Sequence, residues 1–289
     1  RQQANDALHT ICSLITVPVK GFFEALWQIK DQIPDDEYDN YLDYLATAIE
    51  KSEDFGDEEI ETLKEYILPY LNNSEDPNTA SNFLQILMIL VTSNENLIEN
   101  LLPSAINVIM ACFNGDDIGD SSLINCLDFI SNFYDTFDDK YNEAFTDAIS
   151  SVLAILFSDE NEEEENNEDY SMTVKSYALD AGSTVAQAIN DEELAKRIQE
   201  KCVDFFTHDY AFDMDDFDAD EMIEETEYTA IKEGSNASCK IAKLLDIEDS
   251  RTLFINIFEY IKEATSPRCA AEAMKPFTKL LHCSVDEDK

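Results

Sequence analysis

Residues 97–109 read Leu97-Ile98-Glu99-Asn100-Leu101-Leu102-Pro103-Ser104-Ala105-Ile106-Asn107-Val108-Ile109. Apolar side chains recur in this stretch at steps of three and four residues, which is the period of an amphipathic α-helix. The stretches 60–71 and 141–155 repeat the pattern, and strict two-residue alternation is not sustained anywhere in the sequence. The sequence therefore predicts an all-α fold.

The predicted helices return at near-constant spacing. If the helices form pairs, the second helix of each pair starts near Lys20, Glu58, Leu97, Tyr141, Glu193 and Arg251. The first three steps are 38, 39 and 44 residues; the last two are 52 and 58 residues, and each of these contains an acidic insertion. A period of about 40 residues is typical of HEAT and armadillo arrays. We expect a right-handed α-solenoid of about six HEAT-like antiparallel helix pairs.

The two insertions divide this predicted array. About four HEAT-like pairs occupy residues 1–157, and an acidic insertion follows at 158–169. One further pair occupies 170–208, and an acidic-aromatic insertion follows at 209–227. The last pair and a C-terminal helix occupy 228–289.

Local signals mark several helix boundaries. Asn78 and Thr79 are good N-capping residue types just before an apolar run, so they are expected to start a helix there. Pro69 and Pro103 lie within helical patterns, where a kink or a late helix start is expected. These signals sharpen the helix boundaries without changing the predicted fold class.

Composition limits the class of protein. Of 289 residues, 44% are hydrophobic, including 17 Phe and 12 Tyr, so a packed core rather than an acidic disordered tail is predicted. No apolar run approaches the ~20 residues that span a bilayer, and no secretory leader is visible. The missing initiator Met predicts a fragment or a trimmed chain. Seven scattered cysteines without a C-x-x-C pair predict reduced core thiols and a cytoplasmic or nuclear location.

Charge gives the first indication of function. The chain carries 19 Lys and Arg against 63 Asp and Glu, a formal net charge of −44. Such a surface repels nucleic acid and anionic membranes and attracts basic partners. Acids complementing helix dipoles would explain some of this surplus, but not a threefold excess of acid over base. We therefore expect a binding protein for basic proteins or Lys/Arg-rich peptides.

The first candidate site for such cargo is the acidic insertion. In residues 159–169, eight of eleven residues are acidic and none is basic or apolar. The candidate cargo-binding residues there are Asp159, Glu160, Glu162, Glu163, Glu164 and Glu165. The alternative interpretation is a solvated loop that only keeps the protein soluble.

The second candidate site is the acidic-aromatic insertion. Residues 209–227 carry ten acids interleaved with aromatic and methionine side chains. Aromatic rings beside carboxylates hold Arg and Lys by cation–π attraction and by charge together. The candidate residues there are Asp213, Asp215, Asp216, Phe217, Asp218 and Asp220. The alternative is a linker whose aromatic side chains pack into the array.

The same stretch partly matches the spacing of a calcium-binding loop. Asp216, Asp218, Asp220 and Glu227 occupy positions 1, 3, 5 and 12 of an EF-hand-like spacing. Position 6 is Glu221, where the sharp turn of the loop requires Gly. We therefore expect no dedicated metal site and no cofactor, with weak nonspecific binding of divalent cations as the stronger alternative.

Catalysis finds little support in the sequence. His9, His208 and His282 are far apart and have no metal-ligand spacing. Cys202 and His208 do not share a helix face, and no third orienting group accompanies them. No nucleotide-binding or nucleophile-elbow motif occurs. We expect a protein that is not an enzyme.

Several of these stretches resemble a known family. The strings Glu65-Tyr66-Ile67-Leu68-Pro69-Tyr70-Leu71 and Asn100-Leu101-Leu102-Pro103-Ser104-Ala105-Ile106, with the Glu-rich insertion between paired helices, resemble a section of an importin-β (karyopherin) superhelix. The resemblance implies a nuclear transport receptor that releases basic cargo when a Ran-type GTPase binds. It also implies a fragment or a shortened relative. The alternatives are a chaperone for histones or ribosomal proteins and a structural HEAT scaffold subunit of a larger complex.

Overall fold

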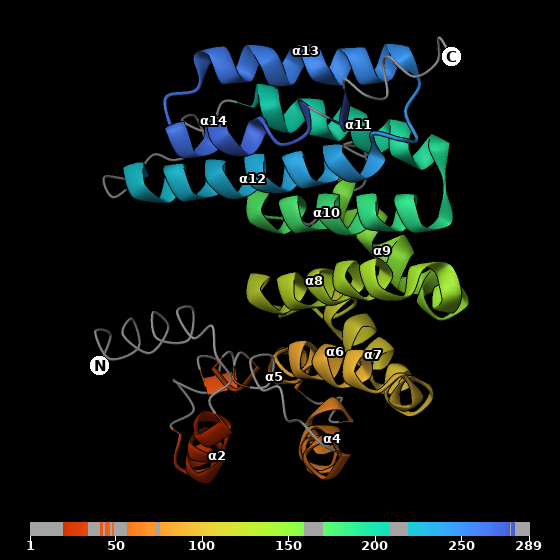
Figure 1. Cartoon of the computed structure of the whole chain (residues 1–289), viewed down its shortest axis with the longest axis vertical. Coiled ribbons are helices and arrows are strands. Elements are labelled where there is room, and N and C mark those ends of the chain that lie inside the picture. Colours follow the sequence, from red (N-terminus) through yellow and green to blue (C-terminus); the bar gives the residue numbers. More distant parts are fainter. Residues whose placement is uncertain are drawn as a thin grey trace. The chain divides into compact units, whose positions relative to one another are not determined.

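The computed structural model describes residues 20–33, 41–42, 44–46, 48, 57–72, 76–158, 170–208, 219–277 and 279–280. Every regular element in these ranges is a helix, and they contain no strand (Figure 1). The prediction of an all-α fold is confirmed. The chain divides into two compact units, Arg1–Phe129 and Ile130–Lys289, so the boundary falls within one helix, α8.

The elements of the N-terminal unit are short to medium helices. They are α2 (Lys20–Ile29), η1 (Lys30–Gln32), α4 (Asp57–Leu71), α5 (Pro77–Ser81), α6 (Leu84–Ser93), η3 (Glu95–Leu97), α7 (Ile98–Phe113) and the first part of α8 (Asp120–Phe137). Pro69 lies inside α4 and Pro103 inside α7, so each helix continues through a residue that cannot donate a backbone hydrogen bond.

The C-terminal unit contains longer helices. After the end of α8 they are η4 (Asp138–Phe145), α9 (Thr146–Leu156), α10 (Met172–Ile189), α11 (Glu192–Thr207), α12 (Ala219–Ile241), α13 (Ile247–Glu263) and α14 (Pro267–Ala273). Within this unit α10 packs against α9, α11 and α12. In addition, α11 contacts α12 and α13, and α14 contacts α12 and α13 (Figure 1). Each of α10, α11 and α12 therefore contacts the helix two places further along the chain, and α10 and α11 also contact the next helix.

The helix starts agree with the predicted spacing to within one residue at four of six places, and α13 begins four residues before the predicted Arg251. Helices begin at Lys20, Asp57, Ile98, Glu192 and Ile247. The prediction near Tyr141 is wrong, because Tyr141 lies in the 3₁₀ segment η4 with non-helical dihedrals (φ −118°, ψ 19°), and α9 begins at Thr146.

The cap predicted at Asn78 or Thr79 is also wrong. Asp76 is the N-cap of α5, and its carboxylate accepts a hydrogen bond from the Thr79 backbone N–H at 3.1 Å. Pro77 follows at the first helical position, where the missing N–H has no cost. The Asn78 side chain instead points away from α5 and makes hydrogen bonds to the turn between α7 and α8.

An aromatic cluster fills the described core of the N-terminal unit. The Trp27 ring lies edge-on to Tyr66 with centroids 4.9 Å apart, and Tyr70 stacks on Phe83 at 4.3 Å. Phe83 is fully buried and Trp27 is half-buried. These ring contacts tie α2 to α4 through Trp27 and Tyr66.

One stretch is longer and more apolar than expected. By length and composition alone, Glu95–Phe113 is the single described helical stretch able to cross a membrane. It contacts α5 and α6, and its Leu101, Ala105 and Ile109 side chains are buried within the N-terminal unit. Helices in the core of a folded domain satisfy the same criterion, so packing accounts for its apolar character.

The described cysteines are free thiols. Cys112, Cys126, Cys202 and Cys269 are buried, and Cys239 is partly buried. Burial raises the pKa of Cys126, and it raises the pKa of the Cys202 thiol to about 12. The Cys126 and Cys202 thiols are therefore protonated at neutral pH, as expected for core side chains.

Candidate basic-partner surface

Most of the predicted cargo-binding residues lie outside the described ranges. This holds for Asp159, Glu160, Glu162, Glu163, Glu164, Glu165, Asp213, Asp215, Asp216, Phe217 and Asp218. Asp220 lies in the first turn of α12, because that helix begins at Ala219. Residues 219–227 of the predicted acidic-aromatic insertion are thus helical.

The same helix rules out an EF-hand loop. Such a loop keeps its first nine positions in an open turn around the ion. Here Asp220 and Glu227, at positions 5 and 12, both belong to α12. The Glu227 carboxylate accepts a hydrogen bond from the Tyr260 hydroxyl at 2.7 Å. Within the described ranges, no cluster of His, Cys, Asp and Glu is arranged to hold a metal ion.

A long stretch of the chain has no positive charge. Between Lys64 and Lys140 the sequence contains twelve Asp and Glu residues and no Lys, Arg or His. Exposed acids of this stretch include Asp116, Asp117 and Asp120 in and beside the α7–α8 turn. No basic side chain close in sequence neutralises these carboxylates, so they give α5 to α8 a uniformly negative character. This absence of bases is visible in the sequence, but the two insertions were predicted as the binding sites instead.

Asn78 holds that acidic turn in place. Its side-chain amide donates to the Asp117 backbone oxygen at 3.1 Å. Its side-chain oxygen accepts from the Gly119 backbone N–H at 3.2 Å and from the Ser122 hydroxyl at 2.8 Å. One side chain on α5 thereby fixes the turn at three points, which reduces the entropy lost when a partner binds the turn's carboxylates.

A second acidic corner lies where α8 meets η4 in the C-terminal unit. The half-buried rings of Phe137 and Tyr141 lie 6.1 Å apart, and the exposed residues Asp138 and Asp139 lie between them in sequence. The Lys140 ammonium lies 5.1 Å from the centre of the Tyr141 ring. At this corner a lysine ammonium thus contacts an aromatic ring beside carboxylates, as is expected of a site that binds basic groups.

The chain contains a complete example of the same chemistry for arginine. The Arg268 guanidinium lies 3.3 Å from the centre of the Tyr228 ring. Its two terminal nitrogens donate to the Glu225 carboxylate at 2.9 and 3.4 Å. Glu225 lies within the stretch 209–227 that was predicted to recognise basic groups by acid and aromatic contacts, and here the arginine it holds belongs to the protein itself.

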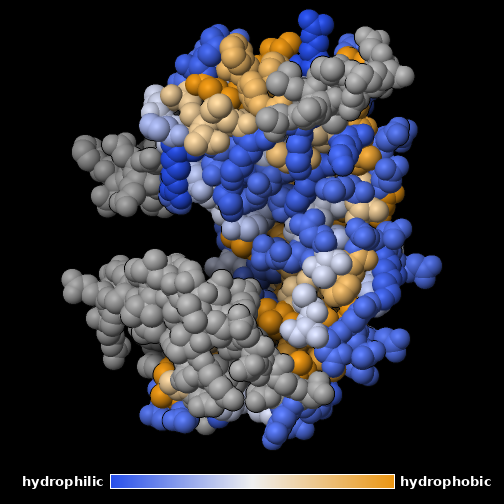
Figure 2. Space-filling model, viewed as in Figure 1, coloured by the Kyte–Doolittle hydropathy of each residue, from blue (hydrophilic) through white to orange (hydrophobic). Residues whose placement is uncertain are grey.

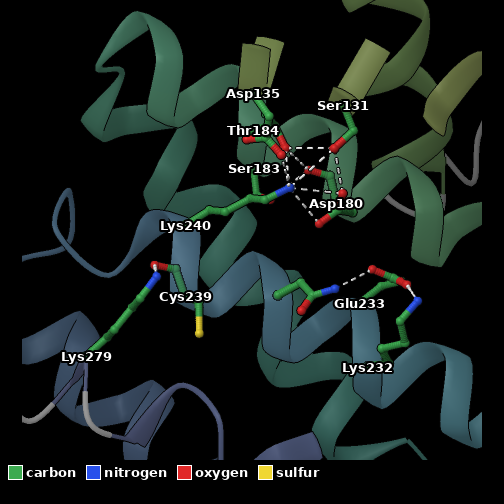
Figure 3. Close-up of polar contacts among 11 residues, drawn as sticks. Ser131, Asp135, Asp180, Ser183, Thr184, Lys232, Glu233, Cys239, Lys240 and Lys279 are labelled. Carbon is green, nitrogen blue, oxygen red and sulfur yellow. Dashed lines mark hydrogen bonds and ion pairs between the residues drawn. The ribbon is translucent and has the colours of Figure 1, made fainter. Parts of the chain in front are cut away.

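The most enclosed polar cluster of the described residues surrounds Lys240 (Figure 3). Its ammonium donates to both Asp180 carboxylate oxygens at 3.0 Å and to the Thr184 hydroxyl. Ser131 lies 3.3 Å away and Asp135 3.5 Å away. These residues come from α8, α10 and α12, so the cluster joins three helices of the C-terminal unit.

This cluster is structural rather than catalytic. A lysine that activates a serine must accept the serine's proton, but the Lys240 nitrogen instead donates hydrogen bonds to Ser131 and to the Asp180 carboxylate. Ser131 donates its own proton to Asp180 at 2.6 Å and is only 5% exposed. The Cys202–His208 pair is no better suited, since the Cys202 thiol is fully buried and His208 is exposed at the end of α11.

Comparison of the chain with protein-family models, with curated proteins and with solved structures found no match. These comparisons neither support nor contradict the resemblance to importin-β. The geometry itself defines an all-helical protein whose described surface carries rigidly held acidic groups beside aromatic rings.

Proposed function

We propose that this chain is an acidic helical-repeat protein that binds basic proteins or Lys/Arg-rich peptides. The observation that carries the proposal is the surplus of acid. Even if each of the 19 basic residues paired with a different acid, 44 carboxylates would have no cation within the chain. Ion pairs already occupy several of these bases, among them Lys64, Lys196, Lys232, Lys262 and Arg268.

The proposed architecture is a right-handed solenoid of HEAT-like pairs. Its support is the contact pattern of the C-terminal unit, where α10 packs on α12, α12 on α14, and α11 on α13. Stacked helix pairs produce this alternation, because equivalent helices of successive pairs lie side by side. In such an array, the acids of successive turns and the two insertions would line one continuous negative surface.

Within this class we propose a nuclear transport receptor of the importin-β type, acting in the cytoplasm and nucleus. The resemblance of the Leu-Pro strings in α4 and α7 supports it, and both strings lie in helices as the resemblance requires. Cargo release by a Ran-type GTPase is part of this proposal. Nucleic acid and membranes are not proposed as partners, because both are anionic.

Paired variants test the proposed site. We would titrate a fluorescent Lys/Arg-rich peptide into the full chain and into the triple variant Glu163→Gln, Glu164→Gln, Glu165→Gln. The matched control, Glu248→Gln, Glu259→Gln, Glu263→Gln, changes the net charge by the same amount. We expect the first variant to weaken binding at least about fivefold and the control less than about twofold. Equal effects would show that only overall charge matters and would reject the insertion as the site.

A Ran-type GTPase separates transport from chaperoning. Loss of the bound peptide when the GTP-loaded GTPase is added is expected for a transport receptor. Retention of the peptide at saturating GTPase would reject that function and would leave a histone or ribosomal-protein chaperone.

A further inference from the structure

A second surface of this chain has the opposite character from its acidic faces. Four of the five exposed large hydrophobic side chains of the described residues lie on α13 or at the end of α14: Ile247, Ile255, Phe258 and the C-cap residue Met274, which are 44%, 48%, 46% and 59% exposed. Hydrophobic colour gathers in the region of these two helices in Figure 2. Scattered exposed apolar residues need no explanation, but a cluster on one face marks an interaction site.

These residues form one stripe along α13. Ile247, Arg251, Ile255 and Phe258 are separated by steps of four, four and three residues, so they project from the same side of the helix. The buried residues Leu253 and Ile257 lie on the opposite side. Phe277 extends the stripe, because its ring centre lies 6.4 Å from Phe258 and 4.5 Å from Phe254. The helix therefore has two apolar faces, of which only one is buried.

The stripe lies in the part of the chain where charge is balanced. Residues 240–280 contain seven Lys and Arg against six Asp and Glu, a net charge of +1 in a chain of −44. At the edge of the stripe, Lys262 pairs with Glu259 and lies 5.7 Å from the centre of the Phe258 ring. The basic partners attracted elsewhere on the protein therefore gain little from this face.

Arg251 gives the stripe a specific charge. It is exposed between Ile247 and Ile255, and no described carboxylate pairs with it. In a chain with more than three acids for every base, an arginine without an internal carboxylate is unusual. A guanidinium between apolar side chains is suited to receive a carboxylate from a partner as the interface closes.

We propose that this stripe docks an amphipathic helix of a different protein, with an apolar ridge and a carboxylate placed opposite Arg251. A helix is the expected occupant because residues spaced at three and four along α13 form a ridge that packs into the grooves of another helix. A second copy of the chain is disfavoured, because a two-fold contact would bring two Arg251 side chains together and add the repulsion of two acidic molecules. This surface is independent of the proposed basic-partner surface.

The probe is a fluorescent amphipathic helical peptide of about 18 residues with Leu on one face and Glu beside it. Binding to the full chain is measured by anisotropy in about 0.3 M NaCl, which screens the repulsion between exposed acids. The double variant Ile255→Ser, Phe258→Ser is expected to weaken binding at least about tenfold. The matched control is Ile29→Ser, which removes the fifth exposed apolar side chain, and it should change binding less than about twofold.

Charge reversal tests the role of Arg251. Arg251→Glu is expected to weaken binding of the Leu/Glu peptide about tenfold. It should strengthen binding of a peptide in which Lys replaces each Glu. Circular dichroism should show that the variants remain folded, because all four substituted side chains are exposed. Absence of binding at about 1 mM peptide, or equal binding by the double variant and the control, would overturn the proposal. A dimer in sedimentation that the double variant abolishes would also overturn it, in favour of self-association.

Discussion

Asp76 illustrates how a single acid can serve the fold rather than a partner. Its side chain caps α5, and the hydrogen bonds from Thr79 lower the pKa of the Asp76 carboxyl. Because the folded-state pKa lies below the unfolded value, the stabilisation is full above the unfolded pKa. It is lost as the pH falls through the folded pKa.

We therefore predict that Asp76→Ala lowers the free energy of unfolding by about 1 kcal/mol at pH 7. The loss should shrink as the pH falls below the unfolded pKa of about 4 and on through the lower folded-state pKa, where the wild-type carboxylate becomes protonated. Urea denaturation at pH 7 and pH 3 measures both values. Asp76→Asn keeps a capping oxygen and is the control. An undiminished loss for Asp76→Ala at pH 3 would mean that the cap does not act through its charge.

Lys240 is the residue on which the packing of the C-terminal unit depends most clearly. It and Asp180 are only 18% and 16% exposed, so removing one leaves the other charged and poorly solvated. We predict that Lys240→Met costs on the order of 3 kcal/mol of unfolding free energy. In a double-mutant cycle, Lys240→Met with Asp180→Leu should recover a substantial part of that loss. A loss below about 0.5 kcal/mol for the single variant would show that the cluster is not structural.

At the scale of elements, the turn between α7 and α8 depends on a contact distant in sequence. Asn78 on α5 bonds the turn at Asp117, Gly119 and Ser122. We predict that Asn78→Ala destabilises the protein by roughly 1–3 kcal/mol, because the buried Ser122 hydroxyl loses its acceptor and two exposed backbone groups lose their bonds. In this variant the hydrogen-exchange rate should increase most at the Gly119 amide. Unchanged protection there would contradict the role given to Asn78.

The elements also show what the sequence can and cannot predict. Helical periodicity located α2, α4, α7, α11 and α13 closely, because their apolar stripes are long and repeat at one period. It failed near Tyr141, where packing among Phe133, Phe137 and Tyr141 accompanies a 3₁₀ segment instead of an α-helix. The Lys240 cluster was not predicted either, because its members lie up to 109 residues apart and have no local pattern.

Some features of the candidate binding surfaces could likewise be predicted from the sequence, and others could not. The acidity and the proximity of acids to aromatic residues are visible in the sequence. Within the chain, Glu225 and Tyr228 together bind the Arg268 guanidinium by charge and by cation–π attraction. The apolar stripe of α13 could not be distinguished from core, because an amphipathic pattern does not tell which of two apolar faces is buried. Only the exposure of Ile255 and Phe258 reveals it.

For the whole molecule, a net charge of −44 should weaken the folded state through self-repulsion. We predict that the midpoint of urea unfolding rises when NaCl is increased from about 0.01 to 0.3 M, because the Debye length falls below the spacing of most surface acids. Urea is uncharged, so the denaturant itself does not screen the repulsion between the carboxylates. A midpoint that is unchanged or lower at high salt would show that the acids are already neutralised by internal contacts.

The most direct test of the central claim is the affinity of the full chain for a Lys/Arg-rich peptide at two salt concentrations. We predict binding at about 0.05 M NaCl that weakens at least tenfold at about 0.3 M, because the attraction arises from exposed carboxylates. A peptide of equal length with Gln in place of Lys and Arg should not bind. Absence of binding by the basic peptide at the lower salt concentration would contradict the account.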